Sequence, residues 1–327
     1  MKKITLLLIG LILMSTPSYA DTRASILLLH NGQGKSFDAE QLQQAVNEAV
    51  SGDTICLSMG TFFLENTLII DKPLCIIGTG NESRIRGSIS IAIDNEPKLT
   101  SYFLENVRLS KDLTIDKKLD GLKIKKCWIG QYFYTSASTY NIEIDRCYIN
   151  GLIPTATMES ALLTNSIIYN LGARLTGLQV WSSEKNFQFV NCNIGQLPNP
   201  NDKVEDFTFT NCIIYAVGGC KVSNSTFVNT LSNNDFSDKD LTTVNCYVDK
   251  MVCNPTNDDN FPSFTINRQD VTSVSIEKGY LGTDGTVVGA YGGSTPYTLE
   301  ADGIHIKESV LKVDPVTRQL NVTLKVE

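Results

Sequence analysis

Four side chains in this sequence could together cleave an acidic polysaccharide: Asp145, Arg146, Arg174 and Lys185. In such a reaction a basic group abstracts a proton, and neighbouring cations neutralise the charge of the uronate. Arg174 and Lys185 belong to an insertion at residues 170–185. If the protein is a lyase or hydrolase, we expect titratable side chains to converge in a groove beside that insertion.

The charges around Asp145 also have a structural explanation. Stacked at one-strand spacing, they would form the series Glu105–Lys125–Asp145 and Lys123–Glu143. Cross-strand ion pairs of this kind contribute roughly 0.2–1 kcal/mol each. Because the signs alternate, the pattern favours an ion ladder that supports a sheet face over a catalytic surface.

Aromatic side chains form a second candidate site, whose chemistry is binding. Trp128 and Tyr148 are expected to lie about 4.8 Å apart on adjacent strands, with Tyr132 and Tyr134 in the loop between them. Flat rings in a row suit stacking against the apolar faces of sugar rings, which predicts a polysaccharide or surface glycan as partner. The alternative is that a loop or the C-terminal hairpin covers the row that contains Trp128 and Tyr148. For that row, the covered arrangement is the favoured one.

The sequence indicates no metal or cofactor site. It has no CxxC pair for zinc, and its two histidines are His30 and His305. The acidic clusters at 235–240 and 258–259 lack the glycine-punctuated spacing of a calcium loop. The Gly-rich stretch at 282–293 lacks the lysine and the following helix of a phosphate loop.

An eight-residue repeat, apolar-x-apolar-x-Asn-Cys-x-apolar, positions the candidate side chains. It is clearest at residues 187–194 and 207–214, and looser copies begin at Tyr102, Leu122, Ile142, Ala161, Cys220 and Leu241. A period near twenty with strand-like alternation predicts stacked turns of one coil. We therefore expect an all-β protein, a single-stranded parallel β-coil.

Each position of the repeat has an expected role. Positions one and three point inward and are apolar in every copy except the last, which has Thr243. Asn at position five suits the left-handed backbone of a sharp bend and can bond to the Asn one turn away. Lys126 and Arg146 interrupt that series, so we expect those two bends to be built differently. Position seven points outward and gives the row Trp128, Tyr148, Ile167, Asn193, Ile213, Thr226 and Tyr247.

The nine cysteines have two possible roles. Disulfides would suit an exported chain, but an odd number leaves at least one cysteine unpaired. Five of the nine occupy position six of the repeat between apolar neighbours. A small thiol packs well at such a site, so stacked core cysteines are the favoured interpretation.

The N-terminus and the charge indicate where the protein acts. Residues 1–20 have the basic start, short apolar run and small-x-small exit of a signal peptide, which predicts export to the periplasm, cell surface or medium. Without Lys2 and Lys3, 26 basic and 35 acidic side chains leave a net charge near −9. That balance argues against nucleic acid as a partner. No later segment resembles a transmembrane helix.

The ends of the coil have distinct patterns. Residues 39–50 predict an amphipathic capping helix, with Asp38 as its cap and Gln41 three residues later. Residues 305–313 and 320–326 alternate around Asp314-Pro315 and predict a β-hairpin. The expected organisation is a signal peptide at 1–20, a β-helix at 21–281, and a Gly-rich closing segment with the hairpin at 282–327.

Two segments carry a family resemblance. Residues 37–80, with GDTICLSMGTF and KPLCIIG, resemble the opening of right-handed parallel β-helix proteins of the pectin lyase-like group. Residues 282–297 (GTDGTVVGAYGGSTPY) resemble the closing segment of secreted β-helix proteins from Bacteroidetes-type bacteria. The resemblance implies the fold, a single-stranded right-handed parallel β-helix, and a lineage, whereas the group includes lyases, hydrolases, adhesins and proteins with no assigned role.

The other catalytic motifs of that group are not found in this sequence, and its one Asp-Asp, at 258–259, lies past the repeat. The hydrolases of the group carry Gly-His-Gly and Arg-Ile-Lys, and its pectate lyases carry Trp-Ile-Asp-His and Arg-x-Pro-x-x-Arg; this sequence has none of them. We therefore expect an exported, non-catalytic protein that binds a glycan or acts at the cell surface like an adhesin. A polysaccharide lyase or hydrolase and a purely structural spacer are the alternatives.

Overall fold

A computed structural model describes most of the chain. The described residues are 24–93, 103–153, 158–172, 186–196, 203–216, 221–232, 241–249, 277–298, 306–313 and 320–326. The expected signal peptide, the candidates Arg174 and Lys185, and the acidic clusters at 235–240 and 258–259 lie outside them.

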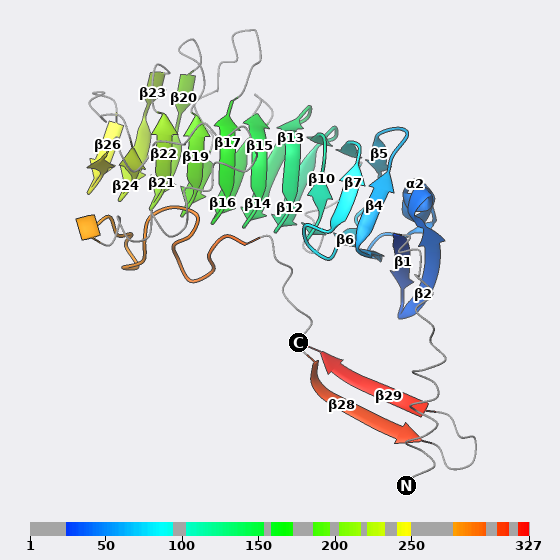
Figure 1. The fold of residues 1–327 in the computed structure, drawn as a ribbon. Helices are drawn as coiled ribbons and strands as arrows, with labels where there is room; N and C mark the ends of the chain where they lie inside the picture. Colours follow the sequence, from blue (N-terminus) through cyan, green and yellow to red (C-terminus); the bar gives the residue numbers. More distant parts are fainter. Residues whose placement is uncertain are drawn as a thin grey trace.

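The protein is an all-β parallel β-helix of about seven turns, with 55% strand and one short N-terminal helix. Successive turns stack side by side along the coil, so each strand pairs with the equivalent strand of the next turn (Figure 1). The repeat therefore predicts the architecture correctly.

Two long sheets, here called sheet A and sheet B, form the walls of the coil. Sheet A runs in the order β2 (Gln33–Asp38), β1 (Ser25–His30), β3 (Thr54–Leu57), β6 (Cys75–Ile77), β9 (Phe103–Glu105), β12 (Leu119–Lys125), β14 (Thr139–Asp145), β16 (Ser160–Thr164), β18 (Asn186–Val190), β21 (Phe207–Thr210), β24 (Ser225–Val228) and β26 (Leu241–Val244). Strand β1 pairs antiparallel with β2 and β3, and the later pairs are parallel.

Sheet B is parallel throughout the strand pairs described. Its main path is β27 (Tyr247–Val248), β25 (Leu231–Ser232), β22 (Ile213–Ala216), β19 (Asn193–Gln196), β17 (Ile167–Leu171), β15 (Tyr148–Ile153), β13 (Trp128–Thr135), β10 (Arg108–Leu109), β7 (Ser83–Arg86) and β4 (Gly60–Phe63). The far half of β13 pairs with a side branch made of β11 (Leu113–Ile115), β8 (Ile89–Ile91) and β5 (Leu68–Ile70).

Smaller elements complete the fold. The N-terminal cap is a 3-10 turn, η1 (Ala39–Gln41), followed by α2 (Leu42–Glu48), and the backbone N–H of Asp38 donates to Gln41 Oε1 at 3.0 Å. Strands β20 (Lys203–Glu205) and β23 (Lys221–Ser223) form a short parallel pair. The predicted hairpin is confirmed as β28 (Ile306–Val313) and β29 (Leu320–Val326). In the described part of the chain no helix has the length and apolar character needed to cross a bilayer.

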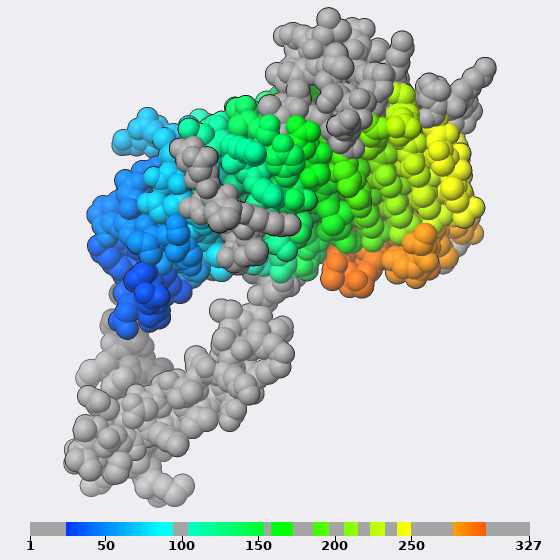
Figure 2. Space-filling view, turned by 180° about the vertical axis from the view of Figure 1, so that it is seen from behind, coloured from blue at the N-terminus to red at the C-terminus, as the bar shows by residue number. Residues whose placement is uncertain are grey.

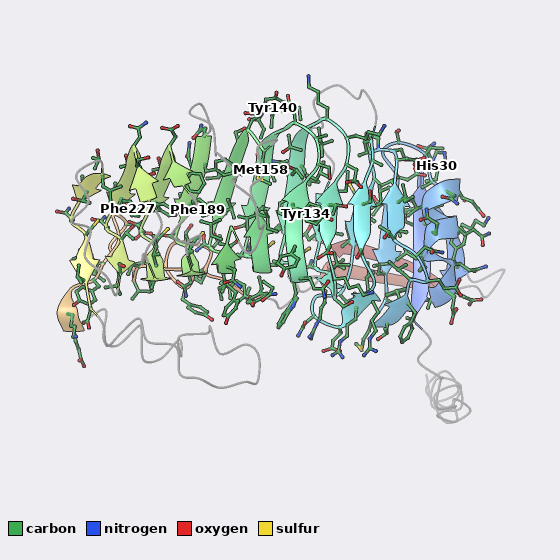
Figure 3. The ribbon with its side chains drawn as sticks, turned by 90° about the horizontal axis from the view of Figure 1, so that it is seen from above. His30, Tyr134, Tyr140, Met158, Phe189 and Phe227 are labelled. Atoms are coloured by element: carbon green, nitrogen blue, oxygen red, sulfur yellow. The ribbon has the colours of Figure 1, made fainter. Side chains whose placement is uncertain are left out.

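The core is built from inward side chains stacked turn upon turn. Phe189, Phe209 and Phe227 follow one another with ring centroids 4.9 Å apart, and all three are fully buried (Figure 3). Phe187 and Phe207 form a second pair, with ring centroids 4.8 Å apart and the rings tilted by 41°. Because each strand repeats the position of the one before, like side chains meet at the spacing of the sheet.

All eight predicted bend residues have the left-handed backbone, with φ between 47° and 56°. The expectation that Lys126 and Arg146 form different bends is therefore wrong. Their backbone N–H groups donate to the next turn at 2.9 and 3.0 Å, as that of Asn106 does at 3.1 Å. The hydrogen bonds between turns fix the bend, and they override the side-chain preference for Asn or Gly.

One copy of the repeat was placed out of register. The sequence puts a copy at Cys220, but the strand that stacks on β21 is β24, with Phe227 paired to Phe209. The bend that follows is at Asn229, whose φ is 45°. The inward Phe227 continues the phenylalanine stack, which favours this register, and the outward row therefore contains Leu231 in place of Thr226.

The cysteines of the repeat pack as core residues. Cys127, Cys147, Cys192 and Cys212 are buried, and each Sγ donates to a backbone carbonyl of its own or the preceding turn. Seven cysteines fall within the described residues and all are free thiols, while Cys220 and Cys253 lie outside. Burial raises the pKa of the Cys147 and Cys212 thiols well above the ordinary value.

Candidate functional site

The outward row of sheet B brings the two principal aromatic candidates together as predicted. Trp128 pairs with Tyr148 in register, and their ring centroids are 4.8 Å apart at an interplanar angle of 36°. Tyr148 pairs in turn with Ile167. The row continues to the last turn through Asn193, Ile213, Leu231 and Tyr247.

Residues 280–297, here called the strap, cover most of that row. Tyr280 packs against Tyr247 in the last turn, with centroids 4.9 Å apart, and Val288 packs with Ile213 and Leu231. Farther along the strap, Ala290 lies in one buried cluster with Trp128, Tyr148 and Ile167. The strap (orange in Figure 2) thus runs back along the coil from its last turn towards its middle.

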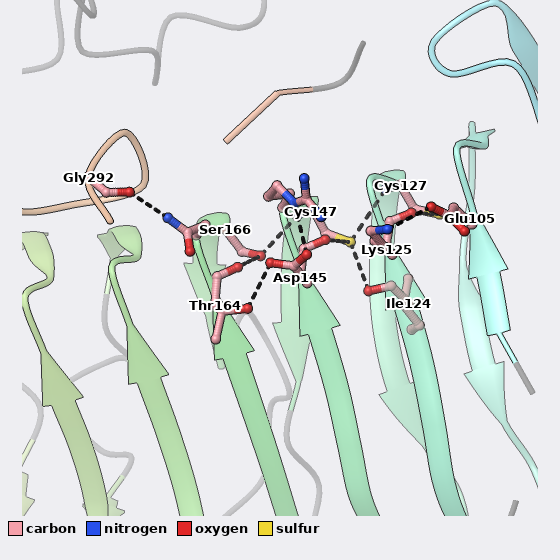
Figure 4. Close-up of polar contacts among 11 residues, drawn as sticks. Glu105, Ile124, Lys125, Cys127, Asp145, Cys147, Thr164, Ser166 and Gly292 are labelled. Carbon is pink, nitrogen blue, oxygen red and sulfur yellow. Dashed lines mark hydrogen bonds and ion pairs between the residues drawn. The ribbon is translucent and has the colours of Figure 1, made fainter. Parts of the chain in front are cut away.

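Asparagines of the coil hold the strap through hydrogen bonds. Asn193 Oδ1 accepts the backbone N–H of Ala290 at 2.9 Å, and Asn211 Oδ1 accepts that of Thr283 at 3.0 Å. Asn165 Nδ2 donates to the carbonyl of Gly292 at 2.7 Å (Figure 4). The sequence predicts that bend asparagines bond to one another, and one such contact is present, from Asn229 Nδ2 to Asn211 Oδ1 at 3.4 Å.

The strap removes Tyr148 from the list of glycan-binding candidates. Its side chain is 1% exposed, so no sugar can stack on it in this arrangement, and burial raises its pKa strongly. Trp128 is 9% exposed, and the guanidinium of Arg108 lies 4.4 Å from its ring centroid. The row is covered, as the favoured alternative expects, and the covering element is the strap.

The other two aromatic candidates lie in the far half of β13, which is a strand and not the predicted loop, and this half pairs with the side branch of sheet B. Tyr134 pairs with Thr114 on β11 and is half-buried (Figure 3). Its pKa is raised by burial and then by the carboxylates of Asp112 and Asp116. The backbone N–H of Tyr132 donates to Asp112 Oδ1 at 2.9 Å. Two rings and two carboxylates therefore share one part of the outer face.

The local backbone positions both tyrosines. The register between β13 and β15 shifts at Tyr132, as in a β-bulge, which re-aims its side chain. Its ring lies against Gly151, where an added Cβ would be 2.4 Å from Tyr132 Cδ1. Only glycine leaves room for this ring.

Hydroxyl groups fix the Asp116 carboxylate at the surface. Ser136 Oγ donates to Asp116 Oδ1 at 3.0 Å, while Ser90 and Thr114 donate to Oδ2, the latter at 3.4 Å. A carboxylate held in this way remains exposed and can accept further hydrogen bonds. The sequence alone does not reveal this group, because its members come from three separate turns.

The catalytic candidates Asp145 and Arg146 bond to each other. Arg146 Nε donates to Asp145 Oδ2 at 2.8 Å, and Thr164 Oγ1 donates to Asp145 Oδ1 at 2.9 Å (Figure 4). Both carboxylate oxygens are therefore engaged. The neighbouring pairs Lys125–Glu105 and Lys123–Glu143, at 3.0 and 2.8 Å, agree with the structural ion ladder.

Three arginines at the N-terminal end of the sheet B row were not singled out from the sequence. Arg84 and Arg108 are direct register partners on β7 and β10, and Arg86 lies two residues beyond Arg84 on the same face. Arg108 occupies position seven of the copy that begins at Tyr102, so the repeat itself contained the signal.

The described residues contain no group of three or more His, Cys, Asp or Glu side chains arranged to hold a metal ion. No protein-family model matches the chain, and no curated protein matches it. The pectin lyase-like family and the bacterial lineage therefore stay predictions, and function is inferred from the geometry alone.

Proposed function

We propose that the protein is an exported, non-catalytic glycan-binding β-helix that binds an uncharged sugar through Tyr132 and Tyr134. The observation that supports this most is the position of Tyr134, a half-buried ring flanked by the carboxylates of Asp112 and Asp116 on the outer face of the coil. Tyr132 and Tyr134 are the two predicted aromatic candidates that the strap does not cover.

The chemistry of this group suits a neutral sugar. A pyranose ring has an apolar C–H face that stacks on tyrosine, and hydroxyl groups around its edge that need hydrogen-bond acceptors. Ionised Asp112 and Asp116 provide acceptors without donating. Their negative charge disfavours a uronate at the same place, because like charges repel.

The rival function, cleavage of an acidic polysaccharide, has weaker support. Asp145 and Arg146 already satisfy each other, and the ladder around them pairs opposite charges. Arg174 and Lys185, the remaining members of that hypothesis, lie outside the described residues. A product assay is therefore part of the test.

The proposal is tested by screening the residue 21–327 protein on a glycan array. We expect hits among uncharged glycans, and about tenfold weaker binding for Tyr134→Ala, since stacking contributes up to about 1.5 kcal/mol. Tyr140→Ala is the matched control, because Tyr140 is an equally half-buried tyrosine on sheet A.

Incubation of each hit with the protein then separates binding from catalysis. New reducing ends or unsaturated sugars would contradict a non-catalytic role and favour the lyase or hydrolase. No hit at all would contradict glycan binding and leave the structural spacer as the better account.

A further inference from the structure

The charges at the N-terminal end of sheet B differ from those of the ion ladder on sheet A. On sheet A, side chains in register across neighbouring strands have opposite charges, as in Lys123–Glu143 and Lys125–Glu105. On sheet B, Arg84 and Arg108 are in register, and Arg86 is on the same face. Like charges directly opposite each other destabilise a sheet, and here they do so in a chain with a net charge of −7.

The described part of the chain only partly neutralises these arginines. Arg84 forms an ion pair with Glu82 at 3.0 Å, and its Nε donates to the carbonyl of Asn81 at 3.3 Å. Among the described residues no carboxylate lies within 4.0 Å of Arg86 or Arg108. The arrangement therefore keeps an excess of two positive charges at one place.

Aromatic rings fix the two arginines that have no carboxylate. Arg108 lies 4.4 Å from the Trp128 ring centroid, and Arg86 lies 5.4 Å from that of Phe63. Stacking on a ring orients a guanidinium while leaving its edge N–H donors accessible, and one of these donors, Arg108 Nη1, bonds to Asn81 Oδ1 at 3.4 Å. The pKa of Arg108 is lowered by burial first and then by Arg84 and Arg86, an effect that Glu82 partly offsets.

We propose that Arg84, Arg86 and Arg108 form an anion site that binds the phosphate monoester of a sugar phosphate. Three guanidinium groups match the several oxygens of a tetrahedral oxyanion, whereas a carboxylate presents only two. After Glu82 is counted, the excess of two charges matches a phosphate monoester, which has about −1.5 to −2 at neutral pH. This site is independent of the proposed sugar site at Tyr132 and Tyr134.

The first experiment is a calorimetric titration of the residue 21–327 protein with glucose 6-phosphate, glucose 6-sulfate and glucose at low salt. We expect glucose 6-phosphate to bind, glucose 6-sulfate to bind more weakly and glucose not to bind at this site. Binding of the phosphate should weaken by about tenfold from pH 7.5 to pH 5, because its second pKa is about 6. The sulfate ester keeps its charge over this range, so a pH effect on the protein itself would weaken both ligands alike.

Variants then assign the site. We expect Arg86→Gln and Arg108→Gln each to weaken phosphate binding at least tenfold, and the matched Arg146→Gln, which removes an arginine paired with Asp145, to leave it unchanged. Arg86→Gln should also unfold at an equal or higher temperature at low salt, since it relieves repulsion. Fluorescence of Trp128, recorded in a Trp181→Phe background, should respond to phosphate because Arg108 stacks on that ring.

Several results would overturn the proposal. Equal affinity for the sulfate and phosphate esters at both pH values would show a nonspecific charge effect. Binding to vesicles that contain phosphatidic acid, without binding to glucose 6-phosphate, would identify a lipid surface as the source of phosphate. Phosphate binding that is lost in Tyr134→Ala would show that the two sites are one, whereas loss in Arg86→Gln alone would leave the sugar-site proposal untouched.

Discussion

The strap should be released by one added methyl group at Gly289. This residue has φ +92°, and a Cβ there would lie 2.3 Å from Asn193 Oδ1 and 2.7 Å from Ile213 Cδ1. Gly289→Ala therefore forces Asn193 or the strap to move, and it endangers the bond from Ala290 N–H to Asn193 Oδ1. The substituted residue belongs to the strap and not to a strand of the coil. We therefore expect the strands of the coil to stay folded.

The size of the effect can be worked from these contacts. A left-handed non-glycine residue costs about 1–2 kcal/mol, and a lost hydrogen bond about 0.5–1.5 kcal/mol, which gives about 1.5–3.5 kcal/mol in total. Opening of the strap should become roughly 10- to 300-fold more frequent. Hydrogen exchange of the amides at residues 286–293 measures this opening directly.

Gly285→Ala is the matched control for Gly289→Ala. Gly285 also has a positive φ, +73°, but an added Cβ would meet nothing within 4 Å. It should therefore show the backbone cost without the clash. If the amides at 286–293 exchange no faster in Gly289→Ala than in Gly285→Ala, the strap does not pack on Asn193 as described.

Three further predictions concern the coil. Phe209→Ala should lower the free energy of unfolding, measured by urea denaturation, by about 3–5 kcal/mol, because Phe209 contacts the rings above and below it. The outward control Thr208→Ala should lower it by about 0.5 kcal/mol or less. Similar losses for both variants would contradict the stacked core. The thiols of Cys147 and Cys212, whose pKa burial raises, should resist a thiol reagent at pH 8 until urea unfolds the protein; rapid labelling of the native protein would show otherwise. Burial also raises the pKa of Tyr148 and Tyr297, so the folded chain keeps protons that the unfolded chain loses above about pH 10. Stability should accordingly fall as pH rises beyond that value, and a flat profile from thermal melts at pH 9 to 11 would count against their burial.

The fold could be predicted because it repeats. Alternation within the copies placed Phe187 and Phe207 inside, and the period near twenty implied stacked turns. The error at Cys220 arose because its neighbours also alternate, and only the phenylalanine stack distinguishes the two registers. The bends at Lys126 and Arg146 were misjudged because hydrogen bonds between turns, and not side-chain preference, determine them.

The site was less predictable because it depends on contacts between distant segments. Whether Tyr148 is exposed depends on Ala290, and the strap has no periodic pattern that would dock it on the coil. Tyr132 and Tyr134 were found from their residue type and their place between two turns. Asp116 was missed because Ser90 and Ser136, which hold it, come from different turns.

The most direct test of the central claim is a calorimetric titration of the strongest glycan-array hit into wild-type protein and Tyr134→Ala under identical conditions. The account predicts a dissociation constant about tenfold higher in Tyr134→Ala and unchanged in Tyr140→Ala, with no new sugar product. Equal affinity in wild type and Tyr134→Ala, or binding lost equally in Tyr140→Ala, would contradict a sugar site at Tyr132 and Tyr134.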